Sequence, residues 1–423
     1  MLLLSTIRNN KENLIQRLNI RGLNGQELIE RAELLDEQAR QIRTEMEKAQ
    51  AQSNALSSQV GALMKDGKKE EADKIKSETV QLKEKIKALT VDVEAKELEL
   101  KNHLLTVPNT PDLSVPAGKS ADDNLTVLTH GSAVELPETA LPHWELATKY
   151  DIIDFELGVK IAGAGFPVYK GKGAILQRAL IQFFLNEAGR NGYMEIQPPL
   201  LVNADSGYGT GQLPDKEGQM YHATVDDLYL IPTAEVPVTN IYRDVILNES
   251  QLPIKNCGYT PCFRREAGSY GAHVRGLNRL HQFDKVEIVQ IVKPEDSYQT
   301  LENMSEYVQS LLQKLGLHYR VLLLCGGDMG FTSAKTYDME VWSPAQKMWL
   351  ECSSVSNFET YQTNRLKCRY RNSEGKTELA HSLNGSALAL PRIVASLLET
   401  YQTEQGIVVP EVLRPYTGFD IIS

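Results

Sequence analysis

Residues 263–289 read FRREAGSYGAHVRGLNRLHQFDKVEIV, and this stretch decides the fold. Every second residue near its end is aromatic or charged, in the order Phe283, Lys285, Glu287. Side chains alternate between the two faces of a β-strand, so these three share one face. By the same alternation, Arg264 and Glu266 share a face of the strand before the loop. The segment therefore predicts strand, loop and strand, with arginines, carboxylates and an aromatic ring converging on one surface of a sheet.

An ordinary surface turn is the simpler alternative, with Arg264 and Glu266 as a common ion pair. That alternative leaves the aromatic ring and the remaining charges of the segment unexplained. A guanidinium group is planar and binds phosphate or carboxylate through two parallel hydrogen bonds. We therefore expect an anion-binding site on this sheet.

A second segment, HSLNGSALALPR at residues 381–392, leads into a run of apolar residues at helical spacing. Pro391 suits the first turn of a helix, where its missing N–H group is not needed. Arg392 then lies at the helix N-terminus, whose free N–H groups and dipole favour an anion. A phosphate there would meet the dipole and a guanidinium together. A buried core helix capped by one arginine is the plainer alternative.

Two further segments are less specific. Residues 348–354, MWLECSS, read as a strand near its end. Glu351 and Ser354 do not share a face by simple alternation, so a bulge or strand end is required to bring them together. A carboxylate beside hydroxyl groups suits a hard cation. Residues 179–202 predict an amphipathic helix followed by a strand that ends in proline, which is a common arrangement.

The first quarter of the chain carries two heptad seams. The first consists of Leu28, Ala32, Leu35, Ala39, Ile42, Met46, Ala49, Ser53, Leu56, Val60 and Leu63, and the second of Ala72, Ile75, Thr79, Leu82, Ile86, Leu89, Val93, Lys96 and Leu100. Residues 66–68 form a glycine-containing turn between them, which predicts an antiparallel coiled-coil hairpin roughly 50 Å long. Residues 65–87 contain eight lysines and six carboxylates, a small excess of positive charge. A dimerisation rod or spacer with a solvated face is an equally simple interpretation of this arm.

Composition sets further bounds. The chain has 423 residues, 42% hydrophobic and 24% charged, which is typical of two or three cored domains. Its net charge of −10 does not exclude a nucleic-acid partner, since a local basic surface is sufficient. The apolar run at residues 321–325 is far too short to span a membrane. We therefore expect no membrane partner. Five cysteines, an odd number that includes Cys257 and Cys262, favour buried thiols and a reducing compartment, so we expect a cytoplasmic protein.

Together these segments resemble the three sequence motifs of the class II aminoacyl-tRNA synthetases, with residues 179–202 as motif 1, 263–289 as motif 2 and 381–392 as motif 3. Within that class, essentially the whole chain resembles the seryl-tRNA synthetase family. The residues that carry this closer resemblance are Thr233-Ala234-Glu235, 263–269, His281-Gln282-Phe283, Asn384-Gly385-Ser386 and Val412-Leu413-Arg414-Pro415-Tyr416.

The resemblance implies an α+β fold, in which a class II antiparallel sheet with flanking helices follows an N-terminal coiled-coil hairpin. Residues 1–113 would form the tRNA-binding arm and residues 114–423 the catalytic domain. Motif 1 implies a homodimer. The implied reaction is ATP-dependent activation of L-serine and its transfer to the 3′-terminal adenosine of tRNA(Ser), with tRNA(Sec) as a second candidate acceptor.

The resemblance also assigns roles to residues. Arg264, which would bridge the serine carboxylate and the α-phosphate, and Arg392, which would grip the γ-phosphate, are the expected catalytic residues. The expected ATP-binding residues are Arg264, Arg265, Glu266, Arg279, Leu280, Phe283, Glu351, Cys352, Ser353, Ser354 and Arg392. The expected serine-binding residues are Thr233, Ala234, Glu235, Arg264, Glu287, Asn384 and Ser386. Thr233 and Glu235 are two residues apart, so we expect them on one face of a strand. Glu351 and Ser354 would bind Mg²⁺.

Two other functions compete with this interpretation. One is a synthetase-like paralogue that acts on a carrier protein or serves as a binding module. The other is a structural coiled-coil dimer with an inert globular head.

Overall fold

The computed structural model describes residues 1–215, 217–266 and 274–423. The chain forms two compact units. The first comprises Met1–Asn19 with Leu23–Pro108, and the second comprises Ile20–Gly22 with Asn109–Ser423. No helix among the described residues is long and apolar enough to cross a bilayer.

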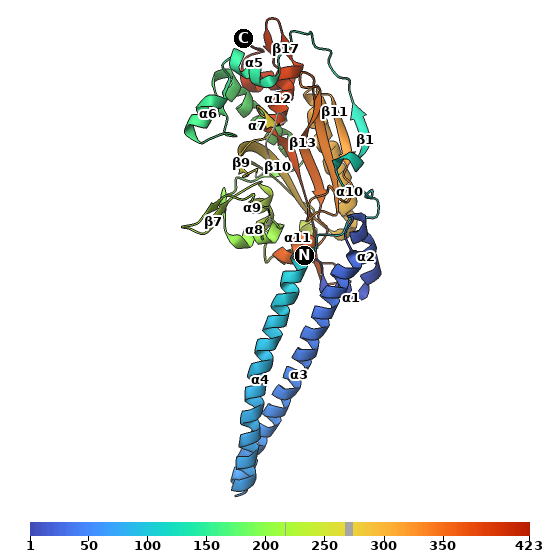
Figure 1. Ribbon diagram of the computed structural model, residues 1–423, viewed down its shortest axis with the longest axis vertical. Coiled ribbons are helices and arrows are strands. Elements are labelled where there is room, and N and C mark those ends of the chain that lie inside the picture. Colours follow the sequence, from blue (N-terminus) through green and yellow to red (C-terminus); the bar gives the residue numbers. More distant parts are fainter. Residues whose placement is uncertain (216, 267–273) are drawn as a thin grey trace. The chain divides into compact units, whose positions relative to one another are not determined.

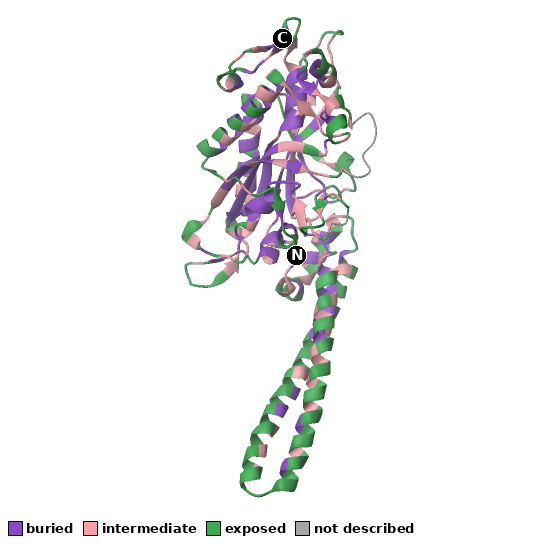
Figure 2. Ribbon diagram, turned by 90° about the vertical axis from the view of Figure 1, so that its left-hand side faces the viewer, coloured by how far each residue is buried: buried purple, intermediate pink, exposed green. Residues whose placement is uncertain are grey.

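The first unit contains the predicted antiparallel hairpin, formed by α3 (Gly25–Lys65) and α4 (Lys69–Leu104) (Figure 1). Gly67 adopts a φ of +76° in the turn, a left-handed conformation that favours glycine. The seam is buried at Ala32, Leu35, Ala39, Ala49, Ser53, Ala72, Thr79, Val93 and Leu100. Most of the remaining hairpin surface is exposed (Figure 2). The predicted hairpin is therefore confirmed.

Two short helices that the heptad pattern did not indicate precede the hairpin, α1 (Leu4–Asn9) and α2 (Lys11–Ile20). They pack on the base of α3. Arg8 pairs with the buried Asp36 at 2.6 Å, and a Cβ at Gly25 would lie 3.0 Å from Leu18. Ile7, Leu14 and Leu18 of these two helices and Ile29 of α3 are buried apolar residues.

The second unit is built on an eight-stranded sheet with the order β1-β11-β12-β13-β16-β10-β9-β4. Its strands are β1 (Leu125–His130), β4 (Met194–Glu195), β9 (Ile254–Phe263), β10 (Gln282–Val292), β11 (Tyr319–Leu323), β12 (Lys335–Ser343), β13 (Met348–Asn357) and β16 (His381–Ala389). All neighbours pair antiparallel except β4, which runs parallel to β9. The predicted α+β fold with an antiparallel sheet is confirmed.

Helices α7 (Gly171–Arg190), α10 (Ser297–Lys314) and α12 (Leu390–Thr400) pack against the sheet. Phe184, Leu312 and Leu398 from these helices are fully buried in the main apolar core. Val286 and Ile288 of β10 point into the same core. Alternation then turns Lys285 and Glu287 to the opposite face of the sheet, where a cavity is free to form.

Shorter elements complete the unit. The helices are α5 (His143–Lys149), α6 (Phe155–Ile161), α8 (Ala204–Thr210), α9 (Glu235–Asn240), α11 (Tyr361–Leu366) and α13 (Arg414–Thr417). The strands of the small sheets are β2 (Ile153–Asp154), β3 (Val168–Tyr169), β5 (Leu201–Val202), β6 (His222–Ala223), β7 (Leu228–Leu230), β8 (Ile246–Asn248), β14 (Arg369–Arg371), β15 (Thr377–Leu379), β17 (Gln402–Thr403), β18 (Gly406–Val408) and β19 (Ile421–Ile422).

The motif 1 segment forms the predicted helix, which begins at Gly171 rather than near residue 179. The following strand, β4, spans only Met194–Glu195 and does not extend to the prolines as predicted. Lys170, in an extended conformation, is the residue immediately before the helix. All five cysteines are free and buried, as predicted for ordinary thiols.

Candidate active site

A cavity of about 480 Å³ opens on the face of the sheet opposite the helices. Fifteen of the seventeen predicted site residues line it: Thr233, Glu235, Arg264, Glu266, Arg279, Leu280, Phe283, Glu287, Glu351, Cys352, Ser353, Ser354, Asn384, Ser386 and Arg392. They come from β10, β13, β16, the starts of α9 and α12, and the segments beside the β9–β10 loop. Segments more than 150 residues apart in the sequence therefore meet in one cavity.

The other two predicted residues, Arg265 and Ala234, lie outside the residues that line the cavity. The Arg265 guanidinium lies over the Tyr221 ring, 6.0 Å from its centroid. Ala234 is fully buried in a small apolar cluster with Val238 and Val289.

Arg264 and Glu266 reach the cavity, but not by strand alternation as the sequence pattern suggested. Strand β9 ends at Phe263, which pairs with Gln282. Glu266 has a φ of +49°, so the backbone has left the extended conformation that alternation requires. The Arg264 guanidinium lies 5.2 Å from the centroid of the Phe283 ring, and Glu266 forms an ion pair with Arg279. Residues 267–269 of the predicted motif lie outside the described residues.

Thr233 and Glu235 also reach the cavity by another route than predicted. They do not lie on a strand, because α9 begins at Glu235 and Ala234 already has helical dihedral angles. The Thr233 hydroxyl instead accepts a hydrogen bond from the Glu235 backbone N–H at 3.2 Å. The start of α9 thus brings Thr233 and Glu235 together, although we expected a strand to place them on one face.

Lys285 is a cavity residue to which the sequence analysis assigned no role. Its Nζ donates to the Thr233 hydroxyl at 2.9 Å and pairs with Glu287 at 2.5 Å. Alternation along β10 had placed Lys285 between Phe283 and Glu287 on the same face, so the signal was present. Asp338 of β12 also lines the cavity, opposite Ser354 of β13. No local pattern marks Asp338, because only strand pairing brings it to the site.

The bulge that Glu351 and Ser354 require is present. In the pairing of β12 with β13, Met339 is opposite Ser353 and Glu340 is opposite Glu351, which leaves Cys352 as the extra residue. The expectation that this segment lies near a strand end is wrong, since β13 continues to Asn357. The bulge therefore acts in the middle of the sheet and directs both side chains toward the cavity.

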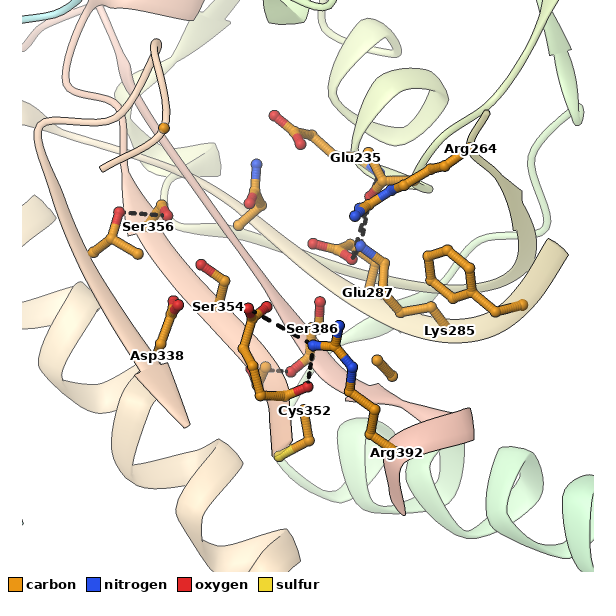
Figure 3. Close-up of a pocket in the computed structure, with 18 of the residues that line it drawn as sticks. Glu235, Arg264, Lys285, Glu287, Asp338, Cys352, Ser354, Ser356, Ser386 and Arg392 are labelled. Carbon is orange, nitrogen blue, oxygen red and sulfur yellow. Dashed lines mark hydrogen bonds and ion pairs between the residues drawn. The ribbon is translucent and has the colours of Figure 1, made fainter. Parts of the chain in front are cut away.

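The motif 3 segment forms the predicted strand and helix, with Pro391 in the first turn of α12. Arg392 follows it and borders the cavity. Its Nη1 donates to the Glu351 backbone oxygen at 2.5 Å and its Nε donates to the Asn278 backbone oxygen at 3.2 Å. Figure 3 shows Arg392 beside Cys352 and Ser354, with Arg264 and Glu235 across the cavity. The two predicted catalytic arginines thus approach one space from different elements.

Glu235 is a buried cavity carboxylate with a raised pKa. Burial and the neighbouring Glu287 carboxylate raise its pKa to about 7, although the hydrogen bond from Gln362, the charge of Lys285 and the nearby Asn384 amide oppose the shift. The Gln362 amide donates to Glu235 at 2.6 Å. Burial and Glu351 likewise raise the pKa of Asp338 well above its usual range. The cavity therefore favours added positive charge near both carboxylates.

Glu235 is expected to make stability depend on pH. Between its ordinary pKa of 4.5 and about 7, the folded protein retains a proton that the unfolded chain has lost. The free energy of unfolding therefore falls as the pH rises through this window. We expect Glu235→Gln to remove this decline, which amounts to on the order of 3 kcal/mol between about pH 5 and about pH 8. Urea unfolding without ligands measures it, with the exposed Glu374→Gln as control. If the free energy of unfolding changed with pH in the same way for wild type and Glu235→Gln, the raised pKa of Glu235 would be contradicted.

Comparison with known proteins identifies the family. The model for the seryl-tRNA synthetase N-terminal domain matches residues 1–111, and the model for the tRNA synthetase class II core domain (G, H, P, S and T) matches residues 220–401. The serine-tRNA ligase of Salinibacter ruber is 52% identical over 99% of this chain and 98% of its own length. That of Akkermansia muciniphila is 47% identical over 100% of this chain and 99% of its own length.

Solved structures agree with the sequence relatives. The seryl-tRNA synthetase of Pyrococcus horikoshii, complexed with ATP, is 32% identical, covers 100% of this chain and 99% of its own, and superposes with a TM-score of 0.93. The cytoplasmic serine-tRNA ligase of Naegleria fowleri, in complex with AMP, is 28% identical with a TM-score of 0.87 and covers 98% of this chain and 96% of its own. The cavity, the hairpin and these full-length matches lead to one conclusion: the chain belongs to the seryl-tRNA synthetase (serine-tRNA ligase) family of class II aminoacyl-tRNA synthetases.

Proposed function

We propose that the cavity condenses L-serine with ATP to form seryl-adenylate, and that the enzyme then transfers serine to the 3′-terminal adenosine of tRNA(Ser). tRNA(Sec) is a second candidate acceptor. The observation that carries this proposal is the meeting of Arg264, Arg392 and Glu235 in one cavity. Two cationic groups there can hold anionic substrates, and a buried carboxylate can hold an ammonium group.

The first step needs little proton transfer. A serine carboxylate oxygen bonds to the α-phosphorus while the bond from that phosphorus to the bridging oxygen of pyrophosphate breaks, and pyrophosphate leaves. The carboxylate is already an anion, so the step needs no general base. The protein must instead hold two repelling anions together and stabilise the charge that develops at phosphorus. The planar fork of Arg264 is suited to bridge the carboxylate and the α-phosphate.

For ATP, we propose that Phe283 stacks on the adenine and Glu266 holds its edge, while Arg279 and Arg392 bind the terminal phosphates. The proposed binding set also includes Leu280, Glu351, Cys352, Ser353 and Ser354. The ATP and AMP bound to the two solved relatives support a nucleotide as a ligand of this chain.

For serine, we propose that Glu235 binds the ammonium group and that Thr233, Glu287, Asn384 and Ser386 surround the rest of the amino acid. Lys285 already pairs with Glu287. No ion pair to Glu235 forms among the residues described by the structure, and burial disfavours its charge. The serine ammonium would supply the missing positive charge. A site that forms hydrogen bonds with the serine hydroxyl would also reject alanine, because the polar groups of the site would have no hydrogen-bond partner when alanine is bound.

For Mg²⁺, we propose Glu351 and Ser354 as the protein ligands. Within the described chain no group of three or more His, Cys, Asp or Glu residues could hold a metal by itself. Mg²⁺ commonly binds through one or two protein oxygens together with substrate phosphates, and this donor set fits that pattern. When bound with ATP, the ion would neutralise phosphate charge.

We also propose that the hairpin binds tRNA, that the enzyme is a homodimer, and that it acts in the cytoplasm. The lysines of residues 65–87 support the first proposal. For the dimer, β4 lies at the sheet edge, and the nearby Met194, Leu200 and Leu201 are exposed apolar residues. The five free cysteines agree with a reducing compartment.

Serine-dependent exchange of labelled pyrophosphate into ATP, without tRNA, tests the proposal. We expect exchange with serine, at most traces with threonine, alanine or glycine, and none after chelation of Mg²⁺. The same preparation should show twice the 47.3 kDa chain mass in light scattering. Exchange with another amino acid would overturn the proposed serine pocket. No exchange, or exchange without charging of tRNA, would favour the paralogue that acts on a carrier protein or as a binding module.

A further inference from the structure

A buried histidine and glutamate outside the cavity form the centre of a polar network that the proposed chemistry does not use. His143 of α5 and Glu399 of α12 are both fully buried, and neither lines the cavity. The Glu399 carboxylate accepts hydrogen bonds from the backbone N–H and the ring Nδ1 of His143, at 3.0 and 2.9 Å. It also accepts from the Ser343 hydroxyl, the Ala345 N–H and the Gln346 amide. Five donors thus surround one buried carboxylate.

These donors keep Glu399 ionised. Burial alone would raise its pKa, but the hydrogen bonds from His143 and Ser343 outweigh burial and hold the pKa below its ordinary value. A buried charge is costly unless it is paired and hydrogen-bonded, so this arrangement calls for an explanation. The explanation is that the carboxylate orients two of the side chains that donate to it, His143 and Gln346.

The hydrogen bond to Glu399 fixes the tautomer of His143. Because its Nδ1 donates to Glu399, its Nε2 carries the lone pair, and that atom accepts the backbone N–H of Leu277 at 2.9 Å. The backbone passes so close to the ring that a Cβ at Gly276 would lie 2.3 Å from Nε2. The Arg275 guanidinium stacks 4.8 Å above the ring of Trp144, the next residue of α5. Helix α5 therefore holds the segment that leads directly into Arg279.

Gln346 carries the second branch of the network. Its amide nitrogen points to Glu399 at 3.1 Å, so its amide oxygen is free to accept from the Asn278 side chain at 2.8 Å. The Asn278 backbone oxygen in turn accepts from Arg392 at 3.2 Å. Residues 277–280 and Arg392 line the cavity. One buried carboxylate is thus linked to both arginines that would meet the terminal phosphates.

We propose that His143 and Glu399 are positioning residues, which hold residues 277–280 so that Arg279 and Arg392 are pre-arranged for the β- and γ-phosphates of ATP. This inference rests on the proposed function, in which those arginines bind the terminal phosphates. AMP lacks both of these phosphates. Loss of the network therefore weakens ATP binding and leaves AMP binding almost unchanged, whereas a general loss of structure weakens both.

Two replacements of His143 separate its two hydrogen bonds. In His143→Asn the amide can still donate to Glu399 from the position of Nδ1, but the Leu277 N–H loses its acceptor. In His143→Gln the amide oxygen can take the place of Nε2 and accept from Leu277. Ser396→Ala is the matched control. It removes another hydrogen bond of α12, from the buried Ser396 hydroxyl to the Trp342 backbone oxygen at 2.9 Å, which does not involve residues 277–280.

Calorimetric dissociation constants for ATP and AMP on the full chain provide the test. We expect His143→Asn to weaken ATP about tenfold and AMP less than about twofold, with His143→Gln within about threefold of wild type for ATP. Ser396→Ala should change neither. Equal weakening of ATP and AMP by His143→Asn, or an equal ATP defect in both His143 variants, overturns the proposal.

A second variant covers the case in which His143→Asn does not fold. Gln346→Met removes the acceptor of Asn278 and the amide that donates to Glu399 and Ser343, but leaves the contact between His143 and Glu399 in place. The side chain is partly exposed, and we expect the change to weaken ATP about threefold with AMP unchanged. An unchanged ratio of ATP to AMP affinity in Gln346→Met would overturn the proposal. Serine-dependent exchange by the wild-type protein is measured alongside. Its absence would refute the proposed function, while the nucleotide ratios would still report on the network.

Discussion

Arg264→Ala is expected to lower serine-dependent pyrophosphate exchange by on the order of 10³-fold, the largest loss for any single residue of the cavity. The guanidinium lies over Phe283 and its Nε donates to the Pro232 backbone oxygen at 3.3 Å. These contacts hold the guanidinium in the cavity, between the proposed adenine and serine positions. Arg264→Lys keeps the charge but loses the two parallel hydrogen bonds, so we expect a loss of about 10²-fold. Initial rates at saturating ATP and serine measure both.

Arg265→Ala is the matched comparison, since it removes the same charge one residue away. The Arg265 side chain lies over Tyr221 and outside the residues that line the cavity. We expect a loss of less than about tenfold, from the long-range charge alone. Near wild-type exchange by Arg264→Lys, or equal losses from the two alanine variants, would remove Arg264 from its proposed role.

Shortening the hairpin is expected to leave serine activation intact and to impair the transfer of serine to tRNA. Met46 and Thr90 face each other across the hairpin, with the Thr90 hydroxyl 3.5 Å from the Met46 sulfur. Deleting residues 47–89 and joining these two positions by a short glycine-serine turn removes all eight lysines of residues 65–87, together with Lys48. The packing of Ile29, Leu35 and Leu100 at the base is retained.

Exchange should stay within about twofold of wild type, because every residue that lines the cavity belongs to the second unit. Charging of tRNA should fall by more than about 10²-fold, and the remaining activity should depend less steeply on salt, since fewer phosphates are neutralised. A full-length variant with Lys83, Lys85 and Lys87 replaced by glutamine should show an intermediate loss. Equal loss of exchange and charging in the shortened protein would refute this division of labour.

Local periodicity was sufficient for the parts of the structure that repeat along the chain. The seams of α3 and α4 follow from apolar spacing of three and four residues, and the shared face of Phe283, Lys285 and Glu287 follows from strand alternation. The start of α12 at Pro391 and Arg392 follows from the geometry of a helix N-terminus. Each of these patterns needs only residues close in sequence, so no knowledge of distant segments was required.

The sequence thus determined the fold class, the hairpin and most members of the cavity, whereas the routes by which several members reach it were decided by tertiary structure. The left-handed Glu266, the helix start at Glu235 and the bulge at Cys352 depend on which strands and loops pack beside them. Asp338 meets Ser354 only because β12 pairs with β13, and Glu399 reaches Leu277 only through His143, more than 100 residues away from either in the chain. Such contacts depend on the packing of the whole unit. A buried polar group is stable only when it is hydrogen-bonded, and its partners here lie far away in the sequence, where no local pattern identifies them.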